Sequence, residues 1–181
     1  MAPPFTLLSR LLHWIMAAMI LAMLFIGIAM VASLSDYHWL VALHKPLGIA
    51  VLVLVAIRLV NRIFNPAPPL PAAMPKLLRV VAHASHIVLY ALMFALPLVG
   101  WGMLSAARYP IVLFGPLQLP PILPHDAMLA ATLRTTHTVL ALLLFATFLA
   151  HLGAALMHAL IFRDGVFASM AAWPGGKNET S

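Results

Sequence analysis

Hydrophobic residues in this chain fall into four long runs, separated by short segments that are polar or rich in proline. The runs cover about residues 11–34, 37–62, 77–105 and 126–163. Each run is longer than the roughly 20 residues that a helix needs to cross the hydrocarbon core of a bilayer. The pattern therefore predicts an all-α protein, a transmembrane four-helix bundle.

The first run also has features of a secretory signal, because Arg10 precedes it and small residues lie near its end. Its apolar stretch is longer than a typical signal core, so we interpret it as a retained membrane span.

The segments that connect the runs are rich in proline. Residues 65–75 carry prolines at spacings that no helix tolerates, and they predict a stiff linker at the membrane interface. Residues 106–124 are expected to form a loop. Within the third run, Pro97 and Gly100 predict a kink or close helix packing. The short tail after Asp164 is expected to be disordered.

The composition places the chain among proteins that cross the bilayer several times. Of its 181 residues, 64% are hydrophobic and 8% are charged, a balance not found in soluble domains. The length predicts one domain, with residues 1–170 forming the transmembrane unit and residues 171–181 a short cytoplasmic tail. The lack of cysteine in the sequence excludes disulfides, iron–sulfur ligation and haem attachment through a C-x-x-C-H motif. The apolar parts of the runs contain none of the four acidic residues, which argues against a proton-coupled or divalent-cation carrier.

The basic residues predict the orientation of the bundle in the membrane. One end of the bundle receives Arg10, Arg58, Arg62, Lys76, Arg79, Arg163 and Lys177, and the other end receives Lys45, Arg108 and Arg134. By the positive-inside rule, the first end is cytoplasmic and both termini lie there. The formal charge of +6 therefore indicates orientation, and no nucleic-acid partner is expected.

The fourth run contains three histidines on one helix face. His137 and His151 lie 14 residues apart, a spacing that closes to within about 40° of whole turns and rises about 21 Å. His158 follows seven residues later, within about 20° of the same line. Such side chains are costly in a membrane and are usually functional. The alternative is that they are core histidines that hydrogen-bond to neighbouring helices.

Histidines in the first two runs lie at matching depths. His13, early in the first run, matches His151 toward the cytoplasm, and His44, early in the second run, matches His137 toward the exterior. Helix bundles hold cofactors between such facing side chains. The two pairs predict two haem b groups inside the bundle, each with two axial histidines, an arrangement that transfers electrons instead of binding oxygen. Zinc is disfavoured, because a structural zinc site needs four ligands.

Basic residues accompany these histidines, as the carboxylates of the haem propionates require. The predicted partners are Arg10, Lys45, Arg58 and Arg134.

A second polar cluster is predicted at the cytoplasmic end. His83 and His86 lie one turn apart there, and they serve either as polar packing or as part of a quinone or proton-relay site. We predict a quinone site near His158, with Arg10, Lys76, His83 and His86 as its neighbours, because quinone reduction consumes protons and histidine titrates near neutrality.

The sequence resembles the bacterial cytochrome b561 family from Leu8 to about Met170. The resemblance rests on Leu12-His13-Trp14, Leu43-His44-Lys45-Pro46-Leu47-Gly48, Ala82-His83-Ala84-Ser85-His86, Ala150-His151-Leu152-Gly153 and Arg163-Asp164-Gly165. It implies four-helix di-haem membrane proteins whose axial ligands fall on His13, His44, His137 and His151. It also implies a multi-pass location in the bacterial inner membrane.

The resemblance implies an enzyme that oxidises superoxide on the periplasmic side and reduces ubiquinone. Arg108 is then expected to attract the superoxide anion to the exterior surface. Related cytochromes serve as membrane subunits that relay electrons between quinone and a hydrogenase or dehydrogenase, so a redox protein partner is the alternative. A histidine-lined metal carrier is the alternative without redox chemistry.

Overall fold

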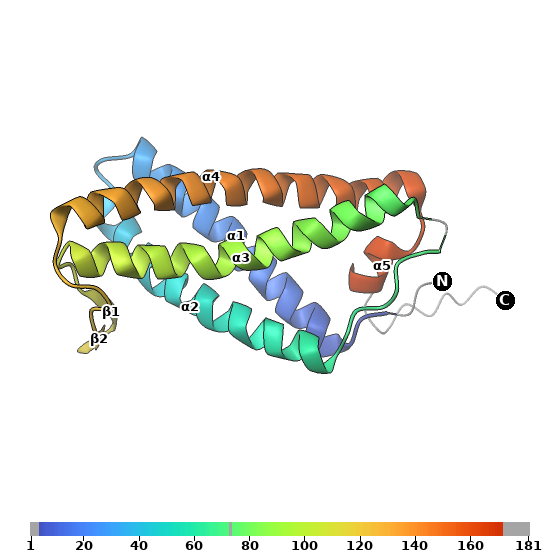
Figure 1. Ribbon diagram of the computed structural model, residues 1–181, viewed down its shortest axis with the longest axis horizontal. Helices are drawn as coiled ribbons and strands as arrows, with labels where there is room; N and C mark the ends of the chain where they lie inside the picture. The colour runs from blue at the N-terminus through green and yellow to red at the C-terminus, as the bar shows by residue number, and fades with distance from the viewer. Residues whose placement is uncertain (1–3, 73, 172–181) are drawn as a thin grey trace.

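The computed structural model describes residues 4–72 and 74–171. Four long helices make up most of the fold: α1 (Leu7–Ala32), α2 (Tyr37–Phe64), α3 (Lys76–Ala106) and α4 (Ala127–Met157) (Figure 1). All four are long and apolar enough to cross a membrane. The predicted all-α bundle of four spans is confirmed, with helix ends that differ from the predicted ones by only a few residues.

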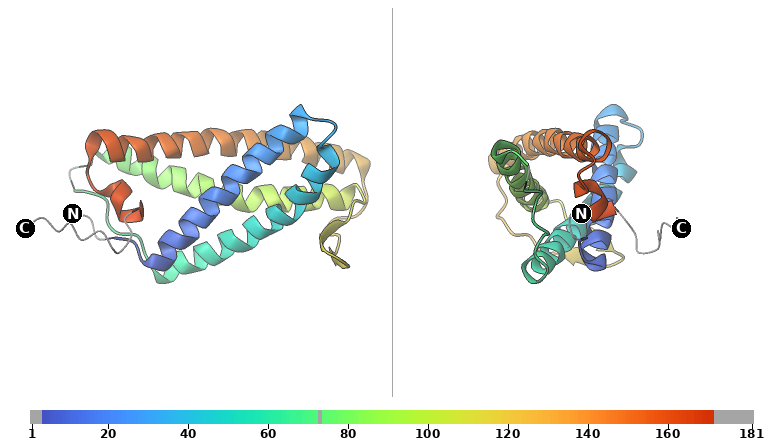
Figure 2. Two further views of the ribbon diagram at one scale, coloured as in Figure 1. Left: turned by 180° about the vertical axis from the view of Figure 1, so that it is seen from behind. Right: turned by 90° about the vertical axis from the view of Figure 1, so that its right-hand side faces the viewer.

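The helices pack in two pairs. α3 runs beside α4 and α1 packs on α2, while α2 also contacts α3. α1 runs obliquely across the bundle, from the end of α2 toward the start of α4 (Figure 2). The oblique path spreads α1 and α4 apart along part of their length, so neither helix buries much of its surface against the other.

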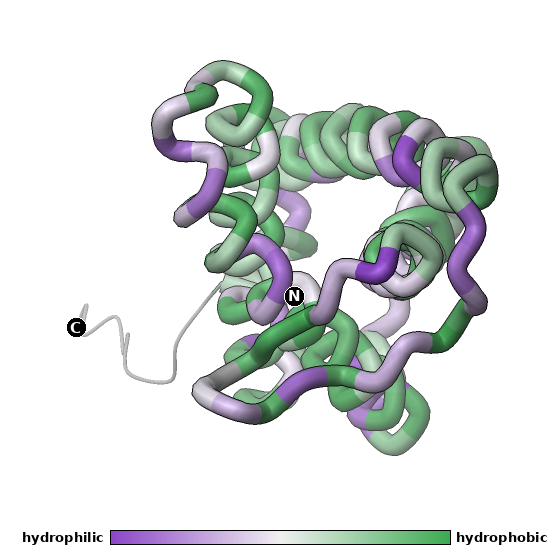
Figure 3. Tube along the Cα trace, turned by 90° about the vertical axis from the view of Figure 1, so that its left-hand side faces the viewer, coloured by the Kyte–Doolittle hydropathy of each residue, from purple (hydrophilic) through white to green (hydrophobic). Residues whose placement is uncertain are grey.

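A small apolar core joins the four helices. It includes Met16 of α1, Val55 of α2, Leu96 of α3 and Leu144 of α4. Val55 is fully buried. Many other large apolar side chains are exposed on the outside of the helices, and polar residues are concentrated in the connecting segments (Figure 3). Lipid supplies the contacts for such a surface, so tight packing is needed only along the helix interfaces.

Side-chain caps fix the starts of two helices. The Ser9 amide donates to Oγ1 of Thr6 at the start of α1 (3.3 Å), and the Leu129 amide donates to Oδ1 of Asp126 at the start of α4 (2.9 Å). Each cap satisfies one of the amides that a helix N-terminus leaves without a partner. Pro97 does not end α3, which continues to Ala106.

The segment predicted to be a loop contains a β-hairpin. β1 (Ile111–Phe114) pairs antiparallel with β2 (Leu117–Leu119). The turn between them places Gly115 at a φ of +51°, a conformation that glycine adopts without strain. The many prolines of this segment obscured the strands in the sequence, because proline is depleted from strands in general but is tolerated next to short edge strands.

The chain after α4 also differs from the prediction. A π-helical turn, η1 (His158–Phe162), ends the fourth span, and a short helix, α5 (Val166–Ala171), follows where a disordered tail was predicted. The amide of Phe5 donates to the carbonyl of Ser169 (3.1 Å), so α5 packs next to the start of the chain. The rest of the predicted tail, residues 172–181, lies outside the described residues.

Candidate functional site

Two pairs of histidines face each other inside the bundle. The ring centres of His13 on α1 and His151 on α4 lie 6.3 Å apart. The ring centres of His44 on α2 and His137 on α4 lie 6.2 Å apart. The two pairs sit about 21 Å apart along α4 by helical rise. We call the end with His13 and His151 the inner end and the end with His44 and His137 the outer end.

The separation within each pair fits an atom held between the two rings. An imidazole nitrogen binds a first-row metal at about 2.0–2.1 Å, and the nitrogen lies about 1.1 Å from its ring centre for ordinary bond lengths. Two such ligands on opposite sides of one metal place the ring centres about 6.2–6.4 Å apart, as in both pairs. Within the described residues, no three His, Cys, Asp or Glu side chains lie close enough together to hold a metal ion. The pairs therefore fit an iron whose other four ligands come from a porphyrin better than they fit zinc.

The outer pair has two further features of a ligand site. Nδ1 of His44 and Nδ1 of His137 are buried and find no hydrogen-bond partner among the described residues, which costs about 1–3 kcal/mol for each group. The backbone of α3 also passes directly beside the His137 ring. A Cβ atom at Gly100 would lie 3.3 Å from Cε1 of His137, so the close packing predicted at Gly100 is present and leaves room for the imidazole alone.

Arg58 forms a hydrogen bond to the inner pair. Its Nη2 donates to Nδ1 of His13 (2.9 Å), and its Nε donates to the hydroxyl of Tyr90 on α3 (3.0 Å). Its Nη1 is buried and lacks a partner within the described residues. Arginine is always a donor, so this guanidinium has a free N–H group that is suited to an anionic acceptor.

His86 lies against the inner pair. Its ring centre is 5.2 Å from that of His151. Nδ1 of His86 donates to the Ala82 carbonyl (2.6 Å), and Nδ1 of His83 donates in the same way to the Arg79 carbonyl (2.7 Å). Because a carbonyl only accepts, the Nε2 atoms of both rings are free to accept a hydrogen bond. Both histidines were predicted to serve in polar packing or in the quinone site, and the position of His86 beside His151 was not predicted.

The remaining predicted cations have different environments. Arg10 is buried, with an Nε atom that has no partner in the described part of the chain. Nζ of Lys45 donates to the Pro110 carbonyl next to the hairpin (3.5 Å). Lys76, Arg108 and Arg134 are exposed. Arg108 has a φ of 60° and lines an outer-end pocket of about 440 Å³ together with Tyr109, Gln118 and His125.

His158 lies at the inner end beyond His151. Its Nδ1 lies 2.7 Å from Oδ2 of Asp164, and its ring centre lies 5.3 Å from that of Phe162. Among the described residues, no hydrogen bond joins His158 to Lys76, His83 or His86, and the quinone site stays a prediction. The contact with Asp164 was not predicted, because a separation of six residues does not match the repeat of an α-helix.

The comparison with known proteins identifies the family. The family model for prokaryotic cytochrome b561 matches residues 4–173. This chain belongs to the prokaryotic cytochrome b561 family. It is 32% identical over 167 residues to cytochrome b561 homolog 2 of Escherichia coli (strain K12), a match that covers 90% of this chain and 88% of that protein. It is 30% identical over 160 residues to the probable superoxide oxidase CybB of Yersinia pestis, covering 88% and 90% of the two chains. Cytochrome b561 homolog 1 of Escherichia coli (strain K12) is 29% identical over 172 residues, covering 88% of this chain and 92% of that one.

The family establishes the general activity. A cytochrome b561 is a membrane protein that binds haem b and transfers electrons. The four membrane-length helices agree with an integral membrane protein. The family resemblance and the electron-transfer class predicted from the sequence are therefore confirmed.

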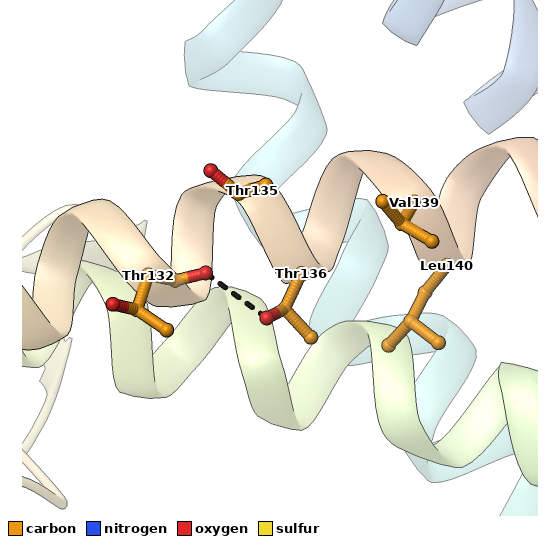
Figure 4. Close-up of a pocket in the computed structure, with 5 residues that line it drawn as sticks. All are labelled: Thr132, Thr135, Thr136, Val139 and Leu140. Atoms are coloured by element: carbon orange, nitrogen blue, oxygen red, sulfur yellow. Dashed lines mark hydrogen bonds between the residues drawn. The ribbon is translucent and has the colours of Figure 1, made fainter.

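A shallow groove of about 430 Å³ lies on α4 of this cytochrome b561 near His137. Thr132, Thr135, Thr136, Val139 and Leu140 line it (Figure 4). Oγ1 of Thr136 donates to the Thr132 carbonyl (2.9 Å), and the other two threonines bond in the same way to carbonyls one turn earlier. Because the hydroxyl donors are satisfied within the helix, the groove offers a mostly apolar surface and no polar site.

Proposed function

We propose that this cytochrome b561 holds two haem b groups and moves electrons from periplasmic superoxide to ubiquinone. The inner haem would be held by His13 and His151, and the outer one by His44 and His137. The proposal rests on one observation: within each pair the two imidazoles face each other, with ring centres 6.3 Å apart in the inner pair and 6.2 Å apart in the outer pair. Haem b held by these histidines would supply one-electron transfer.

Arg58 has a specific role in this proposal. A histidine that binds metal through Nε2 carries its proton on Nδ1, whereas Nδ1 of His13 accepts a hydrogen bond from Arg58. The guanidinium must therefore turn away from His13 when that histidine acts as a ligand. It is then free to pair with a propionate carboxylate, as its buried Nη1 also favours. We assign the same role to Arg10 at the inner end, and to Lys45 and Arg134 at the outer end.

The outer end is suited to an anionic donor. Arg108 is exposed there beside the hairpin, and Lys45 lies next to the same segment. Positive charge raises the encounter rate of a small anion such as superoxide. The name of the Yersinia pestis relative, probable superoxide oxidase, supports this donor. We place the outer end in the periplasm, with residues 1–170 spanning the bacterial inner membrane and both termini, including the 171–181 tail, in the cytoplasm.

The inner end is suited to quinone. His158 lies there with an imidazole that can exchange protons, and His83, His86 and Lys76 are candidate neighbours. The overall reaction is balanced: two superoxide ions each lose one electron and become oxygen. One ubiquinone gains those two electrons and two protons and becomes ubiquinol.

A spectrum of the purified protein, followed by a turnover assay, tests this function. We expect a reduced-minus-oxidised spectrum of low-spin haem b, two haems per chain, and ubiquinone reduction when superoxide is supplied. Reduction only by a co-purified dehydrogenase or hydrogenase would support the electron-relay subunit instead. A colourless protein that binds free metal ions would support the metal carrier.

A further inference from the structure

The inner end carries many positive charges and a single described carboxylate. Asp36 and Asp126 precede α2 and α4 at the outer end, and among the described acidic residues only Asp164 lies at the inner end. The basic residues of the inner end are Arg10, Arg58, Arg62, Lys76, Arg79 and Arg163. Even so, Oδ2 of Asp164 lies 2.7 Å from Nδ1 of His158, and this is the one contact between a carboxylate and a histidine, lysine or arginine side chain found in the described part of the chain.

The backbone is shaped to make this contact. In a continuing α-helix, side chains six residues apart point about 120° away from each other. Here the π-turn η1 ends α4, and the amide of Arg163 donates to the His158 carbonyl (2.9 Å). Arg163 then takes a left-handed conformation with φ 49°, which costs about 1–2 kcal/mol for a residue other than glycine. Turns of the π type often occur at functional sites, and this one returns Asp164 to His158.

The second oxygen of Asp164 fixes the orientation of the carboxylate. Oδ1 accepts a hydrogen bond from the amide of Val166, the first residue of α5 (3.1 Å). α5 is held in turn by Nε1 of Trp14, which donates to the Met170 carbonyl (3.3 Å). The side chains of His158 and Asp164 keep 13% and 23% of their surface exposed. The pair is therefore held by hydrogen bonds on the Asp164 side and keeps part of its surface accessible.

We propose that Asp164 is a positioning residue that makes His158 the proton donor to ubiquinone. The carboxylate accepts the Nδ1 hydrogen, so Nε2 is the nitrogen that exchanges protons. Nε2 gives a proton to a quinone oxygen as electrons arrive, and the ring regains one from water at the inner surface. His158 supplies the proton for one carbonyl oxygen and water supplies the proton for the other, so both oxygens become hydroxyls, with the two electrons supplied by two superoxide ions.

Asp164 can act in this way only if ubiquinone is reduced at the inner end, so this inference rests on the function proposed above. Asp164→Asn is the decisive variant, because asparagine caps a helix as well as aspartate does but carries no charge. Asp126→Asn is the matched control, since it makes the same change at the cap of α4 at the outer end. Both variants are reduced with dithionite and then mixed rapidly with a short-chain ubiquinone.

We expect Asp164→Asn to lower the maximal rate of haem reoxidation by about 10–100-fold. The quinone concentration at half-maximal rate, the haem spectra and the thermal unfolding midpoint should stay unchanged. The solvent isotope effect in D2O should rise, because proton delivery becomes limiting. Asp164→Glu, which restores a carboxylate, should recover part of the rate, and Asp126→Asn should match the wild type.

The other outcomes separate the two proposals. If ubiquinone reoxidises the wild type and Asp164→Asn equally fast, Asp164 has no such role, while the proposed function stands. If Asp164→Asn lowers the rate of haem reoxidation but also loses haem or thermal stability, Asp164 serves only to hold α5 in place and the inference is wrong. If ubiquinone does not reoxidise the wild type at all, the proposed function fails and this inference fails with it.

Discussion

At the scale of single residues, two pairs of facing histidines are the main candidates for the haem ligands of this protein. Each imidazole comes from a different helix than its partner, and α4 contributes one ring to each pair. A lone histidine inside a membrane is explained equally well by helix packing. Two pairs at metal-bridging distance are not, because packing alone gives no reason for the same separation at both depths.

Removing one histidine should remove one haem. His44→Ala and His137→Ala are expected to lose the outer haem, and His13→Ala and His151→Ala the inner one, because each change removes one of the two protein ligands that would hold the group. The haem-to-protein ratio of the purified variants, measured with the visible spectrum, checks this. Two low-spin haems retained in all four variants would show that the pairing is wrong.

Gly100 should be sensitive to any added side chain. A Cβ atom there would lie 3.3 Å from the His137 ring, and overpacking of this kind typically costs about 1–3 kcal/mol. Gly100→Val is expected to displace the ring and lower the occupancy of the outer haem, while the inner haem is retained. Gly27→Ala is the control, since nothing lies within 4 Å of its added Cβ. Equal haem content in the two variants would contradict the role assigned to Gly100.

At the scale of elements, the end of α4 departs from a simple span. The helix passes through a π-turn, reverses at Arg163 and continues into α5. These elements gather His158, Asp164 and the start of α1 at the inner end. A membrane span that ended at Met157 and continued as a free tail would leave His158 without its carboxylate partner.

Replacing His158 should affect quinone and not haem. His158→Leu keeps the apolar volume but removes the nitrogen atoms, so we expect slower quinone reduction, by about 100-fold or more if it is the proton donor. Both haem spectra should be unchanged, because His158 belongs to neither pair. Stopped-flow reoxidation at saturating quinone measures the effect. A wild-type rate under those conditions would remove His158 from the quinone site.

At the scale of the whole molecule, the bundle is an apolar cylinder with charged ends. Its outer surface carries many exposed leucine, isoleucine, valine and phenylalanine side chains, a surface that is stable only in lipid. The few acidic residues leave both ends positive by formal charge. The field at the outer end therefore favours an anionic reactant over a cationic one.

Salt should slow the reaction with superoxide. The Debye length falls from about 10 Å at 0.1 M to about 3 Å at 1 M salt. Salt therefore screens the attraction between superoxide and the positive charges of the outer end. We expect the rate of haem reduction by superoxide to fall several-fold over this range, and Arg108→Glu to lower it further without changing the spectra. Pulse radiolysis with optical detection measures these rates. If the rate responds to neither salt nor the charge reversal, the positive charges of the outer end do not attract superoxide.

The sequence by itself determined the class of the fold and the residues of the paired sites. Four long apolar runs predict membrane helices, because lipid offers no hydrogen-bond partner for backbone N–H and C=O groups. A helix pairs these groups within itself. Helical spacing places His137 and His151 on one face of α4, and alternating topology brings His13 and His44 to matching depths. These inferences need only periodicity and length, which are local properties of the chain.

The tertiary structure decided the contacts that depend on how the helices meet. The spacing within each pair, the approach of Gly100 to His137, and the position of His86 beside His151 follow from the packing of α3 on α4 and the oblique path of α1. The hairpin and the bond between His158 and Asp164 depend on backbone reversals with positive φ at Gly115 and Arg163. Hydrophobic periodicity carries no information about such reversals, because they are set by a few dihedral angles and by the surfaces that the reversed chain finds to pack against.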